Sequence, residues 1–244
     1  DRALAAAQRA FQSWRVVSPM EKSAILRKVG ELSRARAKEI GRNITLDQGK
    51  PLAEAVGEVM RCADHCDWHA EECRRIYGRV IPPRLPNVRQ FVLREPIGVC
   101  AAFTPWNFPI NLSFSGLIAA FAAGNRSMVK MSENSRHLAK LLIEKIPAYF
   151  PKDKLAFFDE TGGVGIEFSK LKFDHILFTG SGLTGRAVMA AASQNLCPVT
   201  LELGGKAPAL ICDDYPLQKA TERITFFKYF NAGQICTTAD HVFV

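Results

Sequence analysis

The chain has 244 residues, of which 48% are hydrophobic and 23% charged, and its formal net charge is +8. This length is enough for one large domain or two modest ones with a sizeable core, and the composition is that of a globular protein. The basic residues are scattered and not interleaved with aromatic ones, which favours a solubilising surface over a nucleic-acid surface. The one basic group on a single predicted helix comprises Arg27, Lys28, Arg34, Arg36 and Lys38.

Cysteine usage bears on the compartment. The seven cysteines are an odd number and show no small disulfide scaffold, which favours free thiols in a reducing cytoplasm. There is neither a signal peptide nor an apolar run of about 18 residues, so we expect no membrane span. One helical stripe carries three thiols and an imidazole, but a single rigid helix cannot wrap four ligands around zinc, so we expect no metal site. This stripe is Cys62, Cys66, His69 and Cys73.

The first hundred residues predict helices and then an extended segment. Ser18-Pro19-Met20-Glu21 has the pattern of a capping box with Pro at the first helical position. Asn43 to Lys50 is predicted to be a polar break, and Pro51 to open a long helix that runs to about Tyr77 and ends at Gly78. Residues 79–97 are rich in Pro and β-formers and predict a hairpin.

From Gly98 onward, short apolar runs alternate with helical stretches. This alternation predicts an α/β fold, in which a Rossmann-like parallel sheet carries helices on both faces. The expected strands are Val99–Phe103, Ser127–Lys130, Leu155–Phe158, His175–Phe178, Val199–Leu203, Ala207–Cys212 and His241–Val244. The expected helices are Phe114–Ala123, Ser135–Tyr149, Thr184–Ser193 and Pro216–Phe230. Cys100, Cys197 and Cys212 lie in or beside these strands and are expected to be inert core thiols.

Three segments at predicted strand ends could hold a ligand. Gly180-Ser181-Gly182-Leu183-Thr184-Gly185 matches the pattern G-x-G-x-x-G between a strand and a helix, which suits a pyrophosphate or merely a tight turn. Asn107 lies in FTPWNFP, where two prolines would fix its amide as an oxyanion donor or as a helix cap. Lys130 and Glu133 could grip a ribose or form a solvated charged loop.

Cys236 and Glu202 suggest covalent catalysis. Cys236 follows Asn231-Ala232-Gly233-Gln234-Ile235, a turn composition that could expose a thiol nucleophile, although it could also be one more buried thiol. Glu202 ends an apolar strand and could serve as general base or, 22 residues past Gly180, as a ribose ligand.

Taken together, the motifs resemble the aldehyde dehydrogenase superfamily. The matching segments, in order, are FTPWNFP, MVKMSE, FTGSGLTG, LELGGK and NAGQIC, and the N-terminal LDQGKPLAEA is similar as well. The resemblance implies that Cys236 attacks the aldehyde, that Asn107 and the Cys236 backbone N–H hold the oxyanion, and that Glu202 activates water. It leaves ribose binding to Lys130 and Glu133.

The resemblance also implies a cofactor site and a domain plan. The cofactor would be NAD, with NADP as the alternative, because Glu133 should repel a 2′-phosphate. Its expected contacts are Thr104, Pro105, Trp106, Lys130, Ser132, Glu133, Gly180, Ser181, Gly185, Leu203 and Gly204. Residues 1–201 would form the N-terminal helices and the NAD(P)-binding domain, with an oligomerisation hairpin at about 79–97. Residues 202–244 would begin a catalytic domain.

The expected reaction oxidises an aldehyde to a carboxylic acid through a thiohemiacetal and a thioester on Cys236. The family's full chain is about twice as long, so we expect a truncated chain whose complete form is a homodimer or homotetramer. The sequence resembles both coniferyl or fatty aldehyde dehydrogenases and succinate-semialdehyde dehydrogenases. A CoA-acylating relative and an inactive or binding-only fragment are the alternatives. Met131 and Gly182 depart from the usual Pro and Thr but remove no reactive group.

Overall fold

A five-stranded parallel sheet organises the computed structural model, which describes residues 1–150, 152 and 154–244. Its strand order is β5-β4-β3-β6-β7. The strands are β3 (Val99–Phe103), β4 (Arg126–Lys130), β5 (Leu155–Phe158), β6 (His175–Gly180) and β7 (Val199–Leu203). The chain winds outward from β3 to β5 and returns to β6 beside β3, so a topological switch point lies between β3 and β6. The predicted α/β fold is confirmed.

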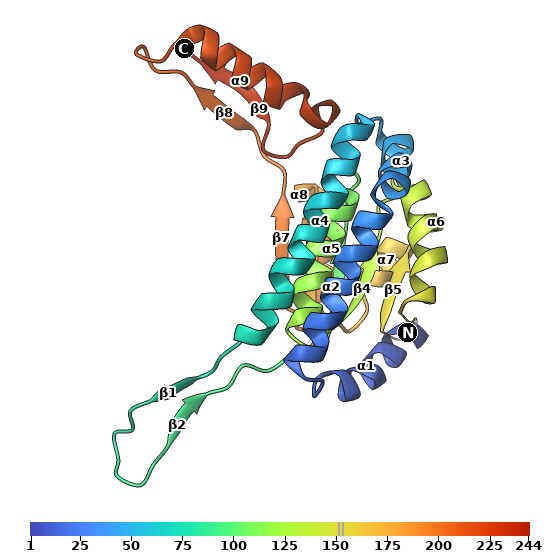
Figure 1. The fold of residues 1–244 in the computed structure, drawn as a ribbon, viewed down its shortest axis with the longest axis vertical. Coiled ribbons are helices and arrows are strands. Elements are labelled where there is room, and N and C mark those ends of the chain that lie inside the picture. Colours follow the sequence, from blue (N-terminus) through green and yellow to red (C-terminus); the bar gives the residue numbers. More distant parts are fainter. Residues whose placement is uncertain (151, 153) are drawn as a thin grey trace.

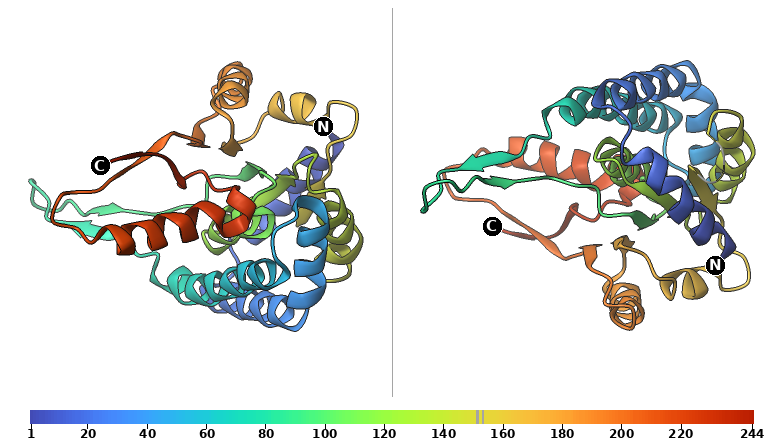
Figure 2. Two further views of the ribbon diagram at one scale, coloured as in Figure 1. Left: turned by 90° about the horizontal axis from the view of Figure 1, so that it is seen from above. Right: turned by 90° about the horizontal axis from the view of Figure 1, so that it is seen from below.

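Helices cover both faces of this sheet (Figures 1 and 2). On one side lie α2 (Pro19–Ala35), α3 (Ala37–Gln48), α4 (Leu52–Glu72), α5 (Pro109–Ala122) and α6 (Arg136–Lys145). On the other lie α7 (Val164–Ser169) and α8 (Gly182–Ser193), and α1 (Arg2–Trp14) adds Leu4 and Ala7 to the same core. Strand side chains alternate between the two cores, because Ala101 and Phe103 belong to one and Ala102 to the other.

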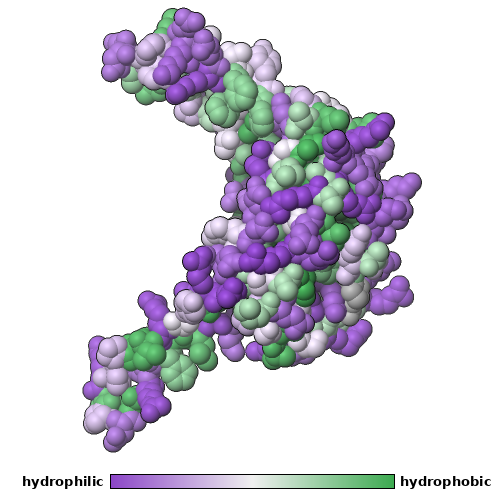
Figure 3. Space-filling model, viewed as in Figure 1, coloured by the Kyte–Doolittle hydropathy of each residue, from purple (hydrophilic) through white to green (hydrophobic). Residues whose placement is uncertain are grey.

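Two parts project from this body (Figure 1). The antiparallel hairpin of β1 (Arg79–Ile81) and β2 (Gln90–Val92) extends from one end. From the other end, β7 leads to the parallel pair β8 (Ala207–Leu210) and β9 (Ala239–Phe243), covered by α9 (Leu217–Tyr229). The outline between the two projections is concave, and hydrophobic side chains gather on the hairpin (Figure 3). Short 3₁₀ turns cover Cys73–Arg75, Ile146–Ala148 and Phe230–Gly233.

The N-terminal helices differ from the prediction. The predicted polar break is wrong, because α3 continues to Gln48 and ends only where Gly49 takes a left-handed φ of 79°. Its Ile44 is fully buried, while Lys38, Glu39 and Arg42 are exposed. The helix predicted to reach Tyr77 stops at Glu72. Helices α1 and α7 were not predicted.

The basic group does not lie on one helix, because a break at Arg36 separates α2 from α3. Two of its arginines form ion pairs. Arg34 pairs with Asp67 at 2.6 Å and with Asp64 at 2.8 Å, and these hydrogen bonds raise the pKa of Arg34. Arg36 pairs with Glu39 at 2.7 Å. These pairs join α2 to α4 and fix the start of α3.

Most cysteines lie where they were expected. Cys62, Cys66, Cys73 and Cys197 are buried, and burial raises the pKa of Cys100 to about 12. The expectation that Cys212 is a core thiol is wrong, because Cys212 is exposed. Strand β8 ends at Leu210, so Cys212 lies beyond the strand in a turn. Among the described residues, no helix is long and apolar enough to cross a membrane.

Candidate active site

The predicted ligand segments meet at the carboxyl edge of the sheet. Phe103 is in register with Lys130 and with Phe178, and Gly180 with Leu203, so the loops that follow these strands lie side by side. They border a cavity of about 660 Å³, large enough for much of a dinucleotide. Eight predicted cofactor residues line it: Thr104, Pro105, Trp106, Lys130, Ser132, Glu133, Gly180 and Ser181.

The Gly180–Gly185 turn combines a cap with close packing. The Ser181 hydroxyl accepts a hydrogen bond from the Thr184 backbone N–H at 3.1 Å, so Ser181 is the N-cap of α8. A Cβ at Gly180 would lie 2.7 Å from the Phe178 ring, and one at Gly185 2.9 Å from Leu203. Packing therefore accounts for both glycines, while Ser181 and the turn face the cavity. Contacts of Gly185, Leu203 and Gly204 with a cofactor stay predictions.

Hydrogen bonds join the Asn107 loop to the turn that precedes Cys236. The Asn107 side-chain amide donates to the Gln234 carbonyl at 2.9 Å, and the Trp106 indole N–H donates to the Gln234 side chain at 3.1 Å. In return, the Asn231 amide donates to the Asn107 carbonyl at 2.9 Å. A primary amide has two N–H donors, so the bond to Gln234 uses one of the two on Asn107. The structure thus brings Asn107 beside the turn that precedes Cys236.

A shell of polar side chains from α3 and α4 holds both loops. The Gln48 amide donates to the carbonyls of Trp106 at 2.9 Å and Asn107 at 3.0 Å, and it accepts from Gln234 at 3.2 Å. Glu54 accepts from the Asn231 backbone N–H at 2.7 Å. Asn231 and Ala232 have positive φ values of 57° and 54°, which is costly for Ala, so these contacts hold a strained turn.

A buried ion pair lies beneath the Asn107 loop. Lys50 and Glu58 have fully buried side chains and approach to 2.6 Å. Glu58 also accepts from the backbone N–H groups of Ile110 at 2.9 Å and Asn111 at 3.0 Å, which satisfies the first turn of α5. The Lys50 ammonium lies 4.2 Å from the centre of the Phe108 ring. Sequence reasoning assigned no role to Gln48, Glu54 or Glu58; the only signal was their place in or just after LDQGKPLAEA.

Cys236 and Glu202 are both exposed and lie on different elements. Cys236 follows the turn that docks on Asn107, whereas Glu202 lies on the edge strand β7, in register with Thr179. In the described part of the chain, no hydrogen bond joins the two side chains. Exposure of Cys236 agrees with the reactive-thiol interpretation and not with one more buried thiol.

Lys130 and Glu133 both reach the cavity, but Lys130 has an unforeseen partner. Its ammonium forms an ion pair with Glu160, a residue that follows β5 and lines the same cavity. Glu133 accepts from the Ser132 hydroxyl at 3.3 Å. Nothing in the sequence pattern singles out Glu160, since it stands in an irregular loop.

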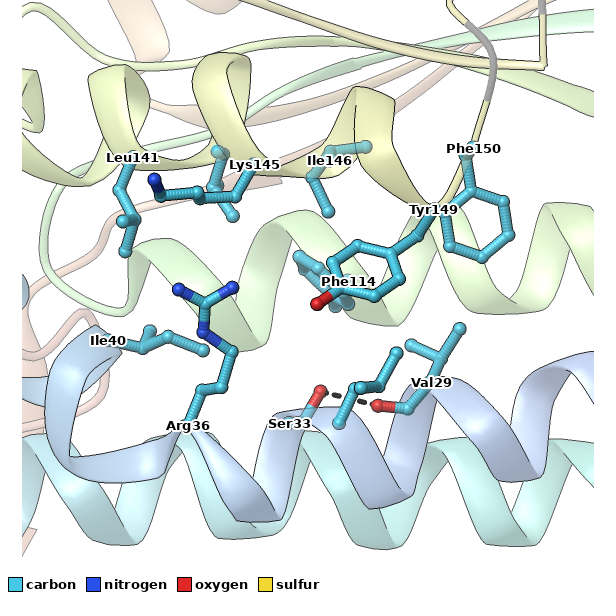
Figure 4. Close-up of a pocket in the computed structure, with 12 residues that line it drawn as sticks. Val29, Ser33, Arg36, Ile40, Phe114, Leu141, Lys145, Ile146, Tyr149 and Phe150 are labelled. Atoms are coloured by element: carbon cyan, nitrogen blue, oxygen red, sulfur yellow. Dashed lines mark hydrogen bonds between the residues drawn. The ribbon is translucent and has the colours of Figure 1, made fainter.

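A second cavity, of about 70 Å³, lies between α2, α5 and α6 (Figure 4). It is mostly apolar, with Val29, Ile40 and Phe114 among its lining residues, and Arg36 and Lys145 stand together at one side (Figure 4). It lies away from the loops that follow the strands, so it belongs to helix packing and not to the candidate active site.

Comparison with known proteins shows the family of the chain. Residues 1–244 match the aldehyde dehydrogenase family. The chain belongs to this family. A glutarate-semialdehyde dehydrogenase of Pseudomonas putida is 39% identical over all of this chain and 51% of its own length. A probable coniferyl aldehyde dehydrogenase of Pseudomonas aeruginosa is 49% identical over 63% of this chain and 32% of its own.

Solved aldehyde dehydrogenase-like structures share the fold. The crystal structure of an E. coli enzyme described as NADP dependent superposes with a TM-score of 0.92 at 38% identity, covering 98% of this chain and 50% of that one. The chain therefore spans about half the length of the relatives it matches. The mixed likeness to semialdehyde and coniferyl aldehyde dehydrogenases agrees with the sequence analysis.

Proposed function

We propose that this chain supplies the cofactor site and the nucleophile of an NAD(P)-dependent enzyme that oxidises an aldehyde to a carboxylic acid. The observation that carries the proposal is the docking of the Cys236 turn on Asn107, beside the cavity bordered by Thr104 to Trp106. Residues 1–201 would bind the cofactor and residues 202–244 begin the catalytic part. The predicted boundary falls inside β7, which continues to Leu203.

The residues fit a dinucleotide. The cavity offers a capped helix N-terminus at Ser181 for phosphate, and Lys130 with Glu133 for ribose hydroxyls. When bound, NAD(P)⁺ would supply the hydride acceptor. Trp106 and Pro105 line the same space and would position the nicotinamide end near the Cys236 turn.

The chemistry then follows from the protein's own groups. The Cys236 thiolate adds to the aldehyde carbon, and the Asn107 amide N–H and the Cys236 backbone N–H stabilise the resulting oxyanion. Loss of hydride converts the thiohemiacetal to a thioester. Glu202 removes a proton from water, which attacks the acyl carbon and breaks the C–S bond, so the carboxylic acid leaves and the thiol is restored.

The test compares two exposed thiols. Aldehyde-dependent NADH or NADPH formation should be lost in Cys236→Ser and kept in Cys212→Ser, across aliphatic, aromatic and semialdehyde substrates. Unchanged turnover in Cys236→Ser would refute the thiol mechanism. Product analysis with and without CoA separates hydrolysis from acyl transfer to CoA. If the wild-type chain is confirmed at its full mass and still shows no turnover, it is a binding-only part of a longer protein.

We also propose that the β1–β2 hairpin packs against a second copy in the complete enzyme. Its apolar side chains are exposed, with Val80 at 89%, Phe91 at 61% and Leu93 at 68% of their full accessibility. A Val80→Ser/Phe91→Ser variant should shift the complete protein towards monomer in light scattering. If the molar mass of the variant is unchanged, the hairpin takes no part in the assembly.

A further inference from the structure

The Lys130–Glu160 ion pair is built into the cofactor cavity. The Lys130 side chain is 11% exposed and that of Glu160 is 20% exposed. The Gly165 backbone N–H donates to both carboxylate oxygens of Glu160, at 3.0 Å and 3.3 Å. Three groups from β4, from the loop after β5 and from α7 thus converge on one charge pair.

Gly165 leaves the space that this pair occupies. A Cβ at Gly165 would lie 2.7 Å from a Glu160 carboxylate oxygen and 3.1 Å from the Lys130 Cε. The first distance is too short for a Cβ, so a larger residue at 165 would require the Glu160 carboxylate to shift. Gly165 therefore both donates to the Glu160 carboxylate and leaves space for it.

Glu160 changes the charge of the ribose end of the cavity. Lys130 is the cation that would otherwise attract a phosphate, but Glu160 neutralises it, and Glu133 lines the same cavity with a second carboxylate. One ammonium and two carboxylates leave a net charge of −1 at this point. The cavity's other cation, Lys170, is 57% exposed and paired with Glu167 at 2.8 Å. It is therefore screened by solvent and by its own partner.

We propose that Glu160 is a specificity-determining residue that makes this site select NAD over NADP. The inference rests on the proposed function and narrows its cofactor. A ribose diol donates hydrogen bonds to carboxylates, whereas a 2′-phosphate carries about −1.5 to −2 charges near neutral pH and is repelled by them. With Glu160 bound to Lys130, a 2′-phosphate meets no uncompensated cation among the described residues that line the cavity.

The experiment measures binding and not turnover. Dissociation constants for NAD⁺, NADP⁺, ADP-ribose and 2′-phospho-ADP-ribose would be determined by titration calorimetry for wild type and Glu160→Gln. A glutamine at 160 can still accept from the Gly165 N–H but no longer neutralises Lys130. Glu144→Gln is the matched control, because it removes one carboxylate from an ion pair with Lys145 that is remote from this cavity. Circular dichroism would confirm that both variants fold.

We expect wild type to prefer NAD⁺, and Glu160→Gln to shift the NAD⁺/NADP⁺ preference towards NADP⁺ by about tenfold or more, which is a free-energy change of about 1.4 kcal/mol. Glu144→Gln should leave the preference unchanged, and added salt should weaken the wild-type preference. If both cofactors bind but Glu160→Gln does not change their ratio, this inference is overturned while the proposed function stands. If wild type binds neither cofactor nor either ADP-ribose, both proposals are refuted.

Discussion

The buried pair of Lys50 and Glu58 allows a sharp test of how the Asn107 loop is held. Glu58 accepts three hydrogen bonds, one from the Lys50 ammonium and two from the first turn of α5, and both side chains are fully buried. Replacing Glu58 by Ala would leave a buried ammonium and two backbone N–H groups without their acceptor. Removing one partner of a buried ion pair typically costs about 3–5 kcal/mol, and each orphaned donor adds about 1–3 kcal/mol.

We therefore expect Glu58→Ala to lower the free energy of unfolding by at least about 4 kcal/mol. Glu58→Gln should cost less, because its amide oxygen can still accept from Ile110 and Asn111. The control is Glu31→Ala, which removes an exposed partner of Lys28 and should cost about 1 kcal/mol or less. Urea unfolding followed by circular dichroism gives the three values. If Glu58→Ala lowers the free energy of unfolding no more than Glu31→Ala does, the stabilising role of the buried pair is refuted.

The same pair predicts a pH dependence with a definite sign. Burial lowers the pKa of Lys50, while Glu58 opposes that shift. Between the lowered pKa and the unfolded value of 10.5, the unfolded chain binds the proton more readily, so stability attributable to Lys50 rises with pH. In Glu58→Gln the opposing carboxylate is gone and the pKa of Lys50 should fall further. The stability deficit of Glu58→Gln should therefore shrink as the pH is raised, and a deficit that grows with pH would contradict this account.

Three further predictions follow from the site and its thiols. Iodoacetamide should modify Cys212 and Cys236 first and leave Cys100 intact in the folded protein, because burial raises the pKa of Cys100 to about 12; peptide mass spectrometry would show the order. In the complete enzyme, Asn107→Ala should lower kcat by about 10²–10³ with a smaller effect on cofactor binding, as expected for loss of an oxyanion donor. Ala232→Gly should keep or raise the melting temperature, because a φ of 54° is strained for Ala; a clear fall would show that the turn is not strained.

The central strand β3 could be predicted from the sequence because it is largely buried, and such a strand appears as a short continuous apolar run. The predicted bounds Val99–Phe103 match the observed ones, and so do Val199–Leu203, although β7 is a largely exposed edge strand. Helix boundaries were harder to predict. The break at Arg36 has neither Gly nor Pro, and the polar residues of α3 indicate a loop only if Ile44 is overlooked. In α1, Leu4, Ala7, Phe11 and Trp14 are buried at helical spacing, a signal that was present but not used.

The site loops could be predicted because parallel topology brings the carboxyl ends of β3, β4 and β6 to one edge, whatever the residues between them. The side chains that hold these loops could not be predicted, because each is polar and its partner is far away in the chain. Gln48 bonds to Gln234 across 186 residues, and Glu54 to Asn231 across 177. No local period or propensity encodes such a pair, since each residue alone suits a solvated helix surface.

Asn107 and the Cys236 turn contact each other, but their geometry is set from α3 and α4, which carry no reacting group. In the proposed mechanism, a rotation of Asn107 after loss of the Gln48 contact would misdirect its amide N–H without removing it. Small displacements of this kind are costly because reacting atoms must be aligned closely. Polar residues of LDQGKPLAEA that each suit a solvated helix surface therefore hold the Asn107 loop and the Cys236 turn in place, whereas Glu202 lies on the exposed edge strand β7.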